Sequence, residues 1–435
     1  MNINTVTVVG ANGTMGTNVS AIFASFGNAK VYMVSRDIEQ SKKAVNKAIK
    51  SVRADSITKN LIPVDYSILE KCVREADLVF ESVAENIEIK QAITKQIALN
   101  LRNDAIACSG TSGLSITALA KLFPENLRGN YMGVHFYNPS YYMTLCEVIP
   151  TPYTNKTLFD EMKSYLANTL FRTVVESKDS PAFIGNRIGF HFINKALQLA
   201  EKYKESGGID YIDAILGAFT GRAMPPLVTS DFVGLDVHKA IVDNIRENTN
   251  DYANDIFSFP VFCQELIDKG SLGRKSGGGL YKTQVLDNGT KRYMVYDIHS
   301  ADYRDTIKYS FPFVEQMVYA LSQGDYKSAL KALLENHSTE AEICVEFMLE
   351  YIIYSLFISL EVGNGIDSAD GVMATGFNWC PPLAMLEAFS NVVPVESLIK
   401  ERLSASLLEK VGADRLLSCI KSSAYDYRSY FKAKK

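Results

Sequence analysis

The first 34 residues constrain the fold of this chain more than any other part of the sequence. A β-branched run at 6–9 ends in a turn that contains Gly10, Gly13 and Gly16, and small and apolar residues typical of a helix follow at 19–26. A second strand-like run occupies 30–34. Strand, glycine turn, helix and strand in this order predict a βαβ unit, the building block of parallel sheets.

The glycine turn also predicts a ligand site. Glycines at such a turn allow a tight bend and let the backbone approach a pyrophosphate, and the N-terminus of the following helix attracts the phosphate. The spacing here is G-x-x-G-x-x-G, one residue longer than the common G-x-G-x-x-G, and an ordinary turn is the alternative interpretation. We expect a nicotinamide dinucleotide to contact Gly10, Asn12, Gly13, Thr14, Met15 and Gly16.

The residues at the end of the second strand bear on which dinucleotide is bound. An NAD site usually has an acid there that accepts hydrogen bonds from the ribose 2′-hydroxyl, whereas this chain has Ser35 and Arg36. A hydroxyl and a guanidinium would hold a 2′-phosphate that a carboxylate would repel. We therefore expect NADP(H) to be favoured over NAD(H), although Asp37 would restore an acid if the register slipped.

Further strand-like runs at 77–83, 105–109, 131–136 and 173–176, with a helical pattern at 87–101, extend this arrangement. The alternation predicts a doubly wound parallel sheet with helices on both faces, a Rossmann-type domain over residues 1–178. Ligands bind at the carboxyl ends of the strands in such sheets.

Composition limits the other function classes. The chain has 435 residues, more than one core usually organises, with 47% hydrophobic and 22% charged residues and a formal charge of −4. No basic surplus indicates nucleic acid, and neither a C-x-x-C pair nor a spacing typical of metal ligands is present. No membrane-spanning run or leader-like N-terminus stands out, so a cytoplasmic protein is expected.

Several ordered motifs stand at the predicted strand ends: residues 109–113 around Ser112, the run 135–139 that starts at His135, and Glu147 twelve positions after that histidine. A glycine-rich run at 272–282 follows further along. With these motifs the sequence resembles the 3-hydroxyacyl-CoA dehydrogenase family over nearly its whole length. It looks most like the dehydrogenase half of bacterial bifunctional proteins that also carry an enoyl-CoA hydratase.

The resemblance implies the roles of individual residues. His135 corresponds to the family's catalytic base and Glu147 to its partner, while Ser112 and Asn186 match polar contacts to the substrate. An imidazole oriented by a carboxylate suits proton transfer at neutral pH. Further residues match positions around the cofactor: Glu85, Lys90, Ser112, Asn138 and Lys275. For Glu85, Lys90 and Lys275 an ordinary helix-start, surface or loop role is almost as good an interpretation.

The second part of the chain reads as helical and contains a repeat. Gly208-Ile209-Asp210 and the later Pro225-Pro226-Leu227 recur as Gly365-Ile366-Asp367 and Pro381-Pro382-Leu383, at offsets of 157 and 156 residues. The pattern predicts a duplicated helical domain. We expect a substrate or dimerisation domain at 179–282, a connector at 283–340 and a divergent copy at 341–435. The resemblance implies that both copies are like the C-terminal domain of 6-phosphogluconate dehydrogenase, in a monomer or a homodimer.

The resemblance implies an oxidoreductase that interconverts 3-hydroxyacyl and 3-ketoacyl thioesters, carried by coenzyme A or by an acyl carrier protein. One alternative is a cofactor-binding module without turnover, which the set of His135, Glu147, Ser112 and Asn186 argues against. A second alternative is a dehydrogenase of a free hydroxy acid, a branch that uses a lysine where this chain has Asn186.

Overall fold

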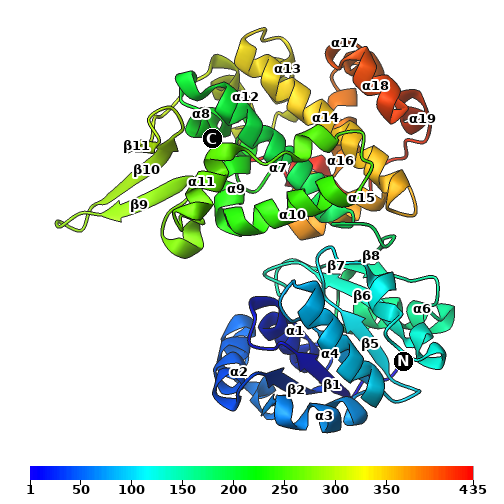
Figure 1. Ribbon diagram of the computed structural model, residues 1–435. Coiled ribbons are helices and arrows are strands. Elements are labelled where there is room, and N and C mark those ends of the chain that lie inside the picture. Colours follow the sequence, from blue (N-terminus) through cyan, green and yellow to red (C-terminus); the bar gives the residue numbers. More distant parts are fainter. Residues whose placement is uncertain (435) are drawn as a thin grey trace. The chain divides into compact units, whose positions relative to one another are not determined.

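The structure of this protein, a computed structural model, describes residues 1–434. The chain forms two compact units, one of residues 1–183 with 362–364 and the other of residues 184–361 with 365–434. The first unit is mixed α/β and the second is mainly helical (Figure 1). Each unit is described by itself below.

An eight-stranded sheet organises the first unit, in the order β3-β2-β1-β4-β5-β6-β7-β8. Its strands are β1 (Thr5–Val9), β2 (Lys30–Ser35), β3 (Leu61–Asp65), β4 (Leu78–Glu81), β5 (Ile106–Ser109), β6 (Tyr131–Phe136), β7 (Leu145–Ile149) and β8 (Thr173–Glu176). The doubly wound, Rossmann-type sheet predicted from the sequence is confirmed. One pair departs from the predicted parallel arrangement, because β7 runs antiparallel to β6. The eight residues between these strands are too few for the helical crossover that a parallel pair needs.

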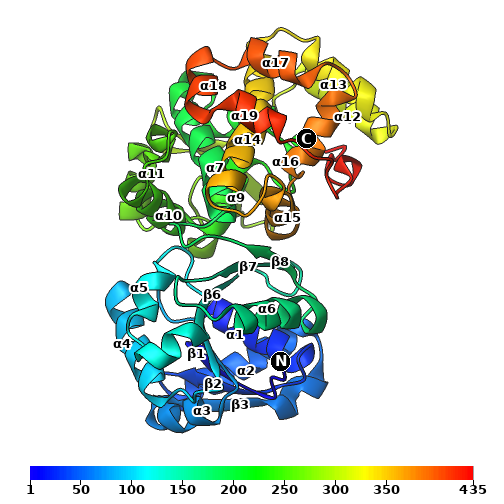
Figure 2. The ribbon, with the colours of Figure 1, turned by 90° about the vertical axis from the view of Figure 1, so that its right-hand side faces the viewer.

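Helices cover both faces of this sheet (Figure 2). They are α1 (Thr14–Ser25), α2 (Ile38–Val52), α3 (Leu69–Glu75), α4 (Ile87–Asn100), α5 (Ile116–Ala120) and α6 (Lys156–Ser164). Successive residues of β1 belong to two separate apolar clusters, one on each face of the sheet. Val8 packs in the cluster with α1 and α2, and Val9 packs in the cluster with α3 and α4. Capping side chains start several helices, as Asn86 does when it accepts a hydrogen bond from the Ile89 amide.

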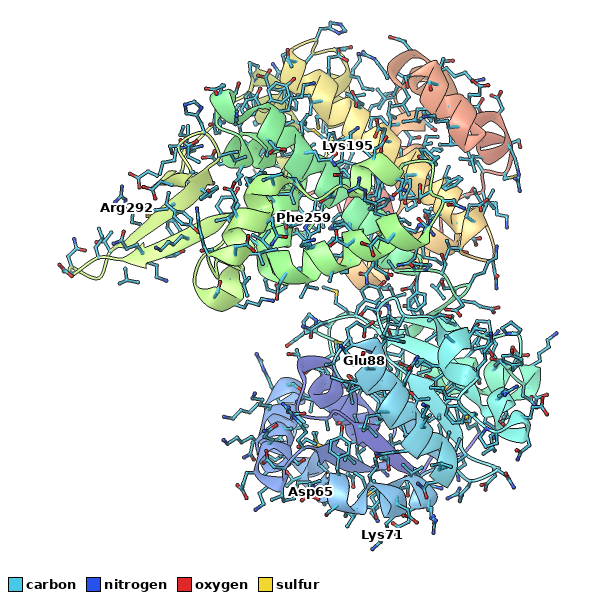
Figure 3. The ribbon with its side chains drawn as sticks, viewed as in Figure 1. Asp65, Lys71, Glu88, Lys195, Phe259 and Arg292 are labelled. Atoms are coloured by element: carbon cyan, nitrogen blue, oxygen red, sulfur yellow. The ribbon has the colours of Figure 1, made fainter. Side chains whose placement is uncertain are left out.

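The second unit contains the helices from α7 onward and a small three-stranded sheet. Its helices are α7 (Gly185–Lys202), α8 (Ile209–Ile215), α9 (Pro226–Val233), α10 (Leu235–Asn248), α11 (Val261–Asp268), α12 (Pro312–Ser322), α13 (Tyr326–Leu334), α14 (Thr339–Glu361), α15 (Ser368–Val372), α16 (Pro382–Ser390), α17 (Val395–Arg402), α18 (Ala405–Val411) and α19 (Ala413–Ser418). The strands are β9 (Tyr281–Val285), β10 (Lys291–Asp297) and β11 (Asp302–Asp305), and the β9–β10 hairpin carries Arg292, which pairs with Asp305 at 2.6 Å (Figure 3).

The sequence repeat corresponds to a repeated piece of structure. Asp213 of α8 accepts a hydrogen bond from the Leu227 amide at the start of α9, at 2.8 Å. Asp370 of α15 accepts the equivalent bond from the Leu383 amide at the start of α16, at 3.0 Å. In each copy, therefore, a buried carboxylate caps a helix that begins at the second of two prolines.

The two copies pack against each other within one unit. Phe192 of α7 meets Phe347 of α14 edge to face, with ring centroids 5.2 Å apart, and also contacts Trp379. The buried guanidinium of Arg222 lies 3.7 Å from the ring centre of Phe192. The stretch expected to be a connector, 283–340, holds most of the small sheet together with α12 and α13.

One helix among the described residues, α14, is long and apolar enough to cross a membrane, although the sequence suggested no such segment. The structure places 72% of its apolar window inside the helical unit. In this structure α14 is the central core helix around which the second copy packs.

Candidate active site

A pocket of about 750 Å³ lies at the carboxyl ends of the central strands of the first unit. A volume of this size suits an organic cofactor. Eight of the residues predicted to bind the cofactor line it: Gly10, Asn12, Gly13, Thr14, Met15, Arg36, Glu85 and Ser112. Further lining residues were not predicted: Tyr66, Ser82, Val83, Ala84, Ile89, Ile93 and Gly110. Ser82, Val83 and Ala84 follow β4 directly, so their position at a strand end was the signal that could have found them.

The glycine turn fits a closely approaching pyrophosphate. Gly10 has φ +84°, and a Cβ there would collide with the Ser82 carbonyl. Gly16 does not line the pocket: a Cβ there would collide with the Gly10 carbonyl, so its role is to let α1 pack against the turn. Gly13 is the N-cap of α1, and the start of this helix therefore faces the pocket, where it favours an anion.

The region predicted to meet the ribose differs in detail from the expectation. Ser35 is fully buried, and its hydroxyl bonds to Ser41 at 2.6 Å and to the Asp37 carbonyl at 2.9 Å. The predicted contact of its hydroxyl with the cofactor is therefore corrected: this hydroxyl is used within the fold. Arg36 is exposed and lines the pocket. The Asp37 carboxylate caps α2 by accepting a hydrogen bond from the Gln40 amide at 2.9 Å.

The next acid along this edge is also engaged locally. Asp65 (Figure 3) is the last residue of β3 and pairs with Ser35 in the strand register. Its carboxylate accepts hydrogen bonds from the Ser67 amide at 2.9 Å and the Ser67 hydroxyl at 2.5 Å. These bonds hold the pKa of Asp65 below its usual value. Asp65 is absent from the pocket lining, which among the described residues contains Arg36 as its cation and Glu85 as its carboxylate.

A buried ion pair supports the floor of the pocket. Lys90 and Glu81 are each only 1% exposed, and Nζ lies 2.8 Å from Glu81 Oε1. Glu81 also accepts hydrogen bonds from the Ser109 hydroxyl at 2.6 Å and the Val83 amide at 2.7 Å. Lys90 Nζ further reaches Glu85 at 3.3 Å. Lys90 was predicted to lie near the cofactor. It does not line the pocket, but it contacts the 82–85 loop and Glu85, which do.

Glu85 connects this network to the loop after β5. Its carboxylate accepts hydrogen bonds from the Ser112 amide at 3.0 Å and from the Thr111 hydroxyl. Ser112 and Glu85, which lie 27 residues apart in the sequence, therefore meet at the pocket wall.

His135 and Glu147 form a cross-strand pair. They lie directly opposite each other in the antiparallel ladder of β6 and β7, which explains their spacing of twelve residues. His135 Nδ1 is 3.1 Å from Glu147 Oε2, and both side chains are buried. Since a carboxylate accepts and does not donate, Nδ1–H is the donor and Nε2 is left as the proton acceptor. β6 neighbours β5, the strand whose end lines the pocket.

The remaining predicted residues lie elsewhere. Asn138 is in the first unit outside the pocket lining, and its side-chain oxygen accepts a hydrogen bond from Asn18 of α1 at 2.9 Å. Asn186 and Lys275 belong to the second unit. Asn186 is buried in the first turn of α7, and Lys275 forms an ion pair with Asp236 at 2.5 Å.

Two family models match the chain. One describes the NAD binding domain of 3-hydroxyacyl-CoA dehydrogenase and matches residues 5–180. The other describes the C-terminal domain of the same enzyme and matches residues 183–283. The first match coincides with the unit that holds the pocket and the His135–Glu147 pair.

Individual relatives agree with these matches. A probable 3-hydroxyacyl-CoA dehydrogenase of Bacillus subtilis is 27% identical over 93% of this chain, which spans about half (52%) of that protein. The human mitochondrial hydroxyacyl-coenzyme A dehydrogenase is 30% identical over 64% of this chain and 90% of its own length.

A crystal structure of Escherichia coli 3-hydroxybutyryl-CoA dehydrogenase has the same fold over 96% of this chain and 99% of its own, with a TM-score of 0.65 at 20% identity. Together the two family models cover more than half of the chain, including the pocket and the first helical copy. The chain therefore belongs to the 3-hydroxyacyl-CoA dehydrogenase family.

Proposed function

We propose that this protein is a reversible oxidoreductase that interconverts 3-hydroxyacyl and 3-ketoacyl thioesters of coenzyme A. The observation that carries the proposal is the buried His135–Glu147 pair, one strand away from a pocket built for a dinucleotide. The relatives whose printed names specify coenzyme A support that carrier over an acyl carrier protein.

Hydride transfer at C3 of the substrate is the chemistry that a bound nicotinamide would supply. In the oxidising direction the hydroxyl proton passes to Nε2 of His135, and in the reducing direction the same nitrogen returns a proton to the carbonyl oxygen. Glu147 holds Nδ1–H and stabilises the imidazolium that forms.

We further propose that NADP(H) is favoured over NAD(H). Two features support this preference: Arg36 lines the pocket beside the end of β2, and the nearby acids Asp37 and Asp65 are used in local hydrogen bonds. A guanidinium is well suited to a 2′-phosphate. With the Ser35 hydroxyl buried, Arg36 is the one of the two residues predicted to hold the 2′-phosphate that lines the pocket.

The test is to follow the loss of reduced-cofactor absorbance with acetoacetyl-CoA, using NADH and NADPH in parallel. We expect turnover with both and a KM at least about tenfold lower for NADPH, as one charge-assisted contact to a phosphate would give. Arg36→Gln removes the cation and should erase the difference. Lys42→Gln, at an exposed position of α2, is the matched control. A tenfold preference of the wild type for NADH would overturn the cofactor proposal.

The His135→Asn variant tests the chemistry separately. It should lower kcat by at least about 100-fold while cofactor affinity stays unchanged, because the imidazole handles the proton and lies outside the pocket lining. Tight cofactor binding without turnover on any acyl-CoA by the wild type would contradict the proposed activity.

A further inference from the structure

The glutamate of the catalytic pair is shared with a third side chain. The Tyr137 hydroxyl donates a hydrogen bond to Glu147 Oε2 at 2.6 Å, and this is the same oxygen that accepts from His135 Nδ1 at 3.1 Å. One carboxylate oxygen thus receives two donors, and the tyrosine bond is the shorter. We propose that Tyr137 is a positioning residue that restrains Glu147 and makes His135 release its proton more readily.

The strand register explains why these groups meet. Tyr137 follows the last residue of β6 directly, and its ring contacts the His135 imidazole, so the two side chains lie on the same side of the sheet. Glu147 lies directly opposite His135, so Tyr137 is its diagonal neighbour, a separation that an aromatic side chain can bridge. Tyr137 and Glu147 are both buried, so water does not weaken the bond between them.

The ring of Tyr137 and its hydroxyl have separable effects. The ring packs edge to face on the His135 imidazole, with centroids 4.6 Å apart, and Phe183 contacts the imidazole at 5.5 Å. These contacts are apolar and would persist with phenylalanine at position 137. The hydroxyl, in contrast, withdraws negative charge from the oxygen that stabilises the imidazolium, since hydrogen bonds to a carboxylate favour its charged form and spread its charge. Its removal increases the negative charge that Glu147 Oε2 presents to His135.

Other ionisable groups near the trio do not compete for this role. Cys146 lies beside Glu147 on β7, and burial raises the pKa of this thiol well above its usual value, which keeps it neutral. Arg172, whose charge acts on Cys146, donates hydrogen bonds to the carbonyls of Leu170 and Ser140. On β8, the residue opposite Glu147 is the apolar Val175.

The direct test is an NMR titration of the histidine Cε1–H signals in the whole protein without substrate or cofactor. The chain has five histidines, and the spectrum of His135→Asn assigns the signal of interest. His191 and His238 stay silent between pH 5 and 9, because burial lowers the pKa of each to about 3. We expect Tyr137→Phe to raise the midpoint of the His135 titration by about 0.7 pH unit, the fivefold change that one ordinary hydrogen bond gives.

Two controls isolate the path through the carboxylate. Tyr131→Phe removes a buried hydroxyl from β6, four residues before His135, and should leave the midpoint of the His135 titration unchanged. In a Glu147→Gln background the further change Tyr137→Phe should also leave this midpoint unchanged, because the carboxylate charge that the tyrosine hydroxyl reduces is absent. An unchanged midpoint in Tyr137→Phe, or the same shift with and without Glu147, would overturn the proposal.

The kinetic consequence rests on the proposed function, whereas the titration does not. In the oxidising direction the acid limb of the kcat/KM profile should move to higher pH in Tyr137→Phe by the same amount as the titration midpoint. If the titration shift is found in a protein that turns over no thioester, the role of Tyr137 as a positioning residue stands and only the proposed activity is refuted.

Discussion

Replacing Lys90 by methionine would remove one half of a fully buried ion pair. Lys90→Met keeps the length and apolar stem of the side chain but leaves Glu81, itself 1% exposed, without its cation. Two hydrogen bonds, from Ser109 and from the Val83 amide, still hold that carboxylate. Breaking a buried pair in this way costs about 3–5 kcal/mol, and the remaining bonds place the expected loss near the lower limit, about 3 kcal/mol.

The paired variant tests the reasoning. Glu81→Gln with Lys90→Met removes both charges, so the loss should fall to about 1–2 kcal/mol, the cost of imperfect hydrogen bonding by the amide. The double variant should therefore be more stable than Lys90→Met alone. If the loss came only from the missing contacts of Lys90, and not from the unpaired charge of Glu81, the double variant would be at least as unstable as the single one.

The two units allow an internal control in the same sample. The chain has one tryptophan, Trp379, which is buried in the helical unit, so its fluorescence follows unfolding of that unit. Hydrogen exchange of peptides from β4 and β5, read by mass spectrometry at increasing urea, follows the first unit. We expect Lys90→Met to lower the urea midpoint of the β4 and β5 peptides by roughly 1–2 M, from a slope of about 2 kcal/mol/M. An unchanged midpoint there would refute the assigned energy.

Three further predictions concern other parts of the chain. Gly10→Ala should weaken cofactor binding at least about tenfold in calorimetry, because its positive φ and the nearby Ser82 carbonyl leave no room for a Cβ, and full affinity would contradict this. Burial raises the pKa of Asp213 to about 7, so its contribution to folding is complete below its unfolded value of 3.8 and is lost as pH rises through 7. Asp213→Asn should therefore flatten the fall in stability of the helical unit between pH 4 and 7, a slope worth about 4 kcal/mol that Trp379 fluorescence in urea would report. Light scattering should give a monomer of 48.2 kDa, because α14 of the same chain covers α7, and a mass twice as large would contradict this.

The candidate site was predictable where chemistry and local sequence order coincide. Gly10 and Arg36 follow strands directly, Gly13 is the N-cap of the next helix, and the pocket includes all three. Ser35 also lies at the end of a strand. Because strand side chains alternate between the two faces, its side chain points into the interior, where its hydroxyl forms a hydrogen bond with that of Ser41. A pattern in one strand cannot show this, because the side that is buried depends on the helix packed against it.

Two features required knowledge of the sheet. The Pro63-containing strand β3 and the reversal at β7 lack a clear sequence signal, since short strands take their stability from neighbours more than from propensity. The partnership of Tyr137 with Glu147 follows from that reversal, as does the direct opposition of His135 and Glu147.

By itself, the sequence determined the doubly wound sheet, the dinucleotide turn, the repeated helical element and the residue types for proton transfer. These features depend on local periodicity, on glycine at a strand end and on internal similarity, which neighbouring residues encode. Only the tertiary structure decided that Glu147 Oε2 accepts hydrogen bonds from both His135 and Tyr137, that Lys90 is buried against Glu81 and that the Ser35 side chain is buried. Such relations join residues from different strands and helices, and they exist only once strand order, register and burial have brought those residues together.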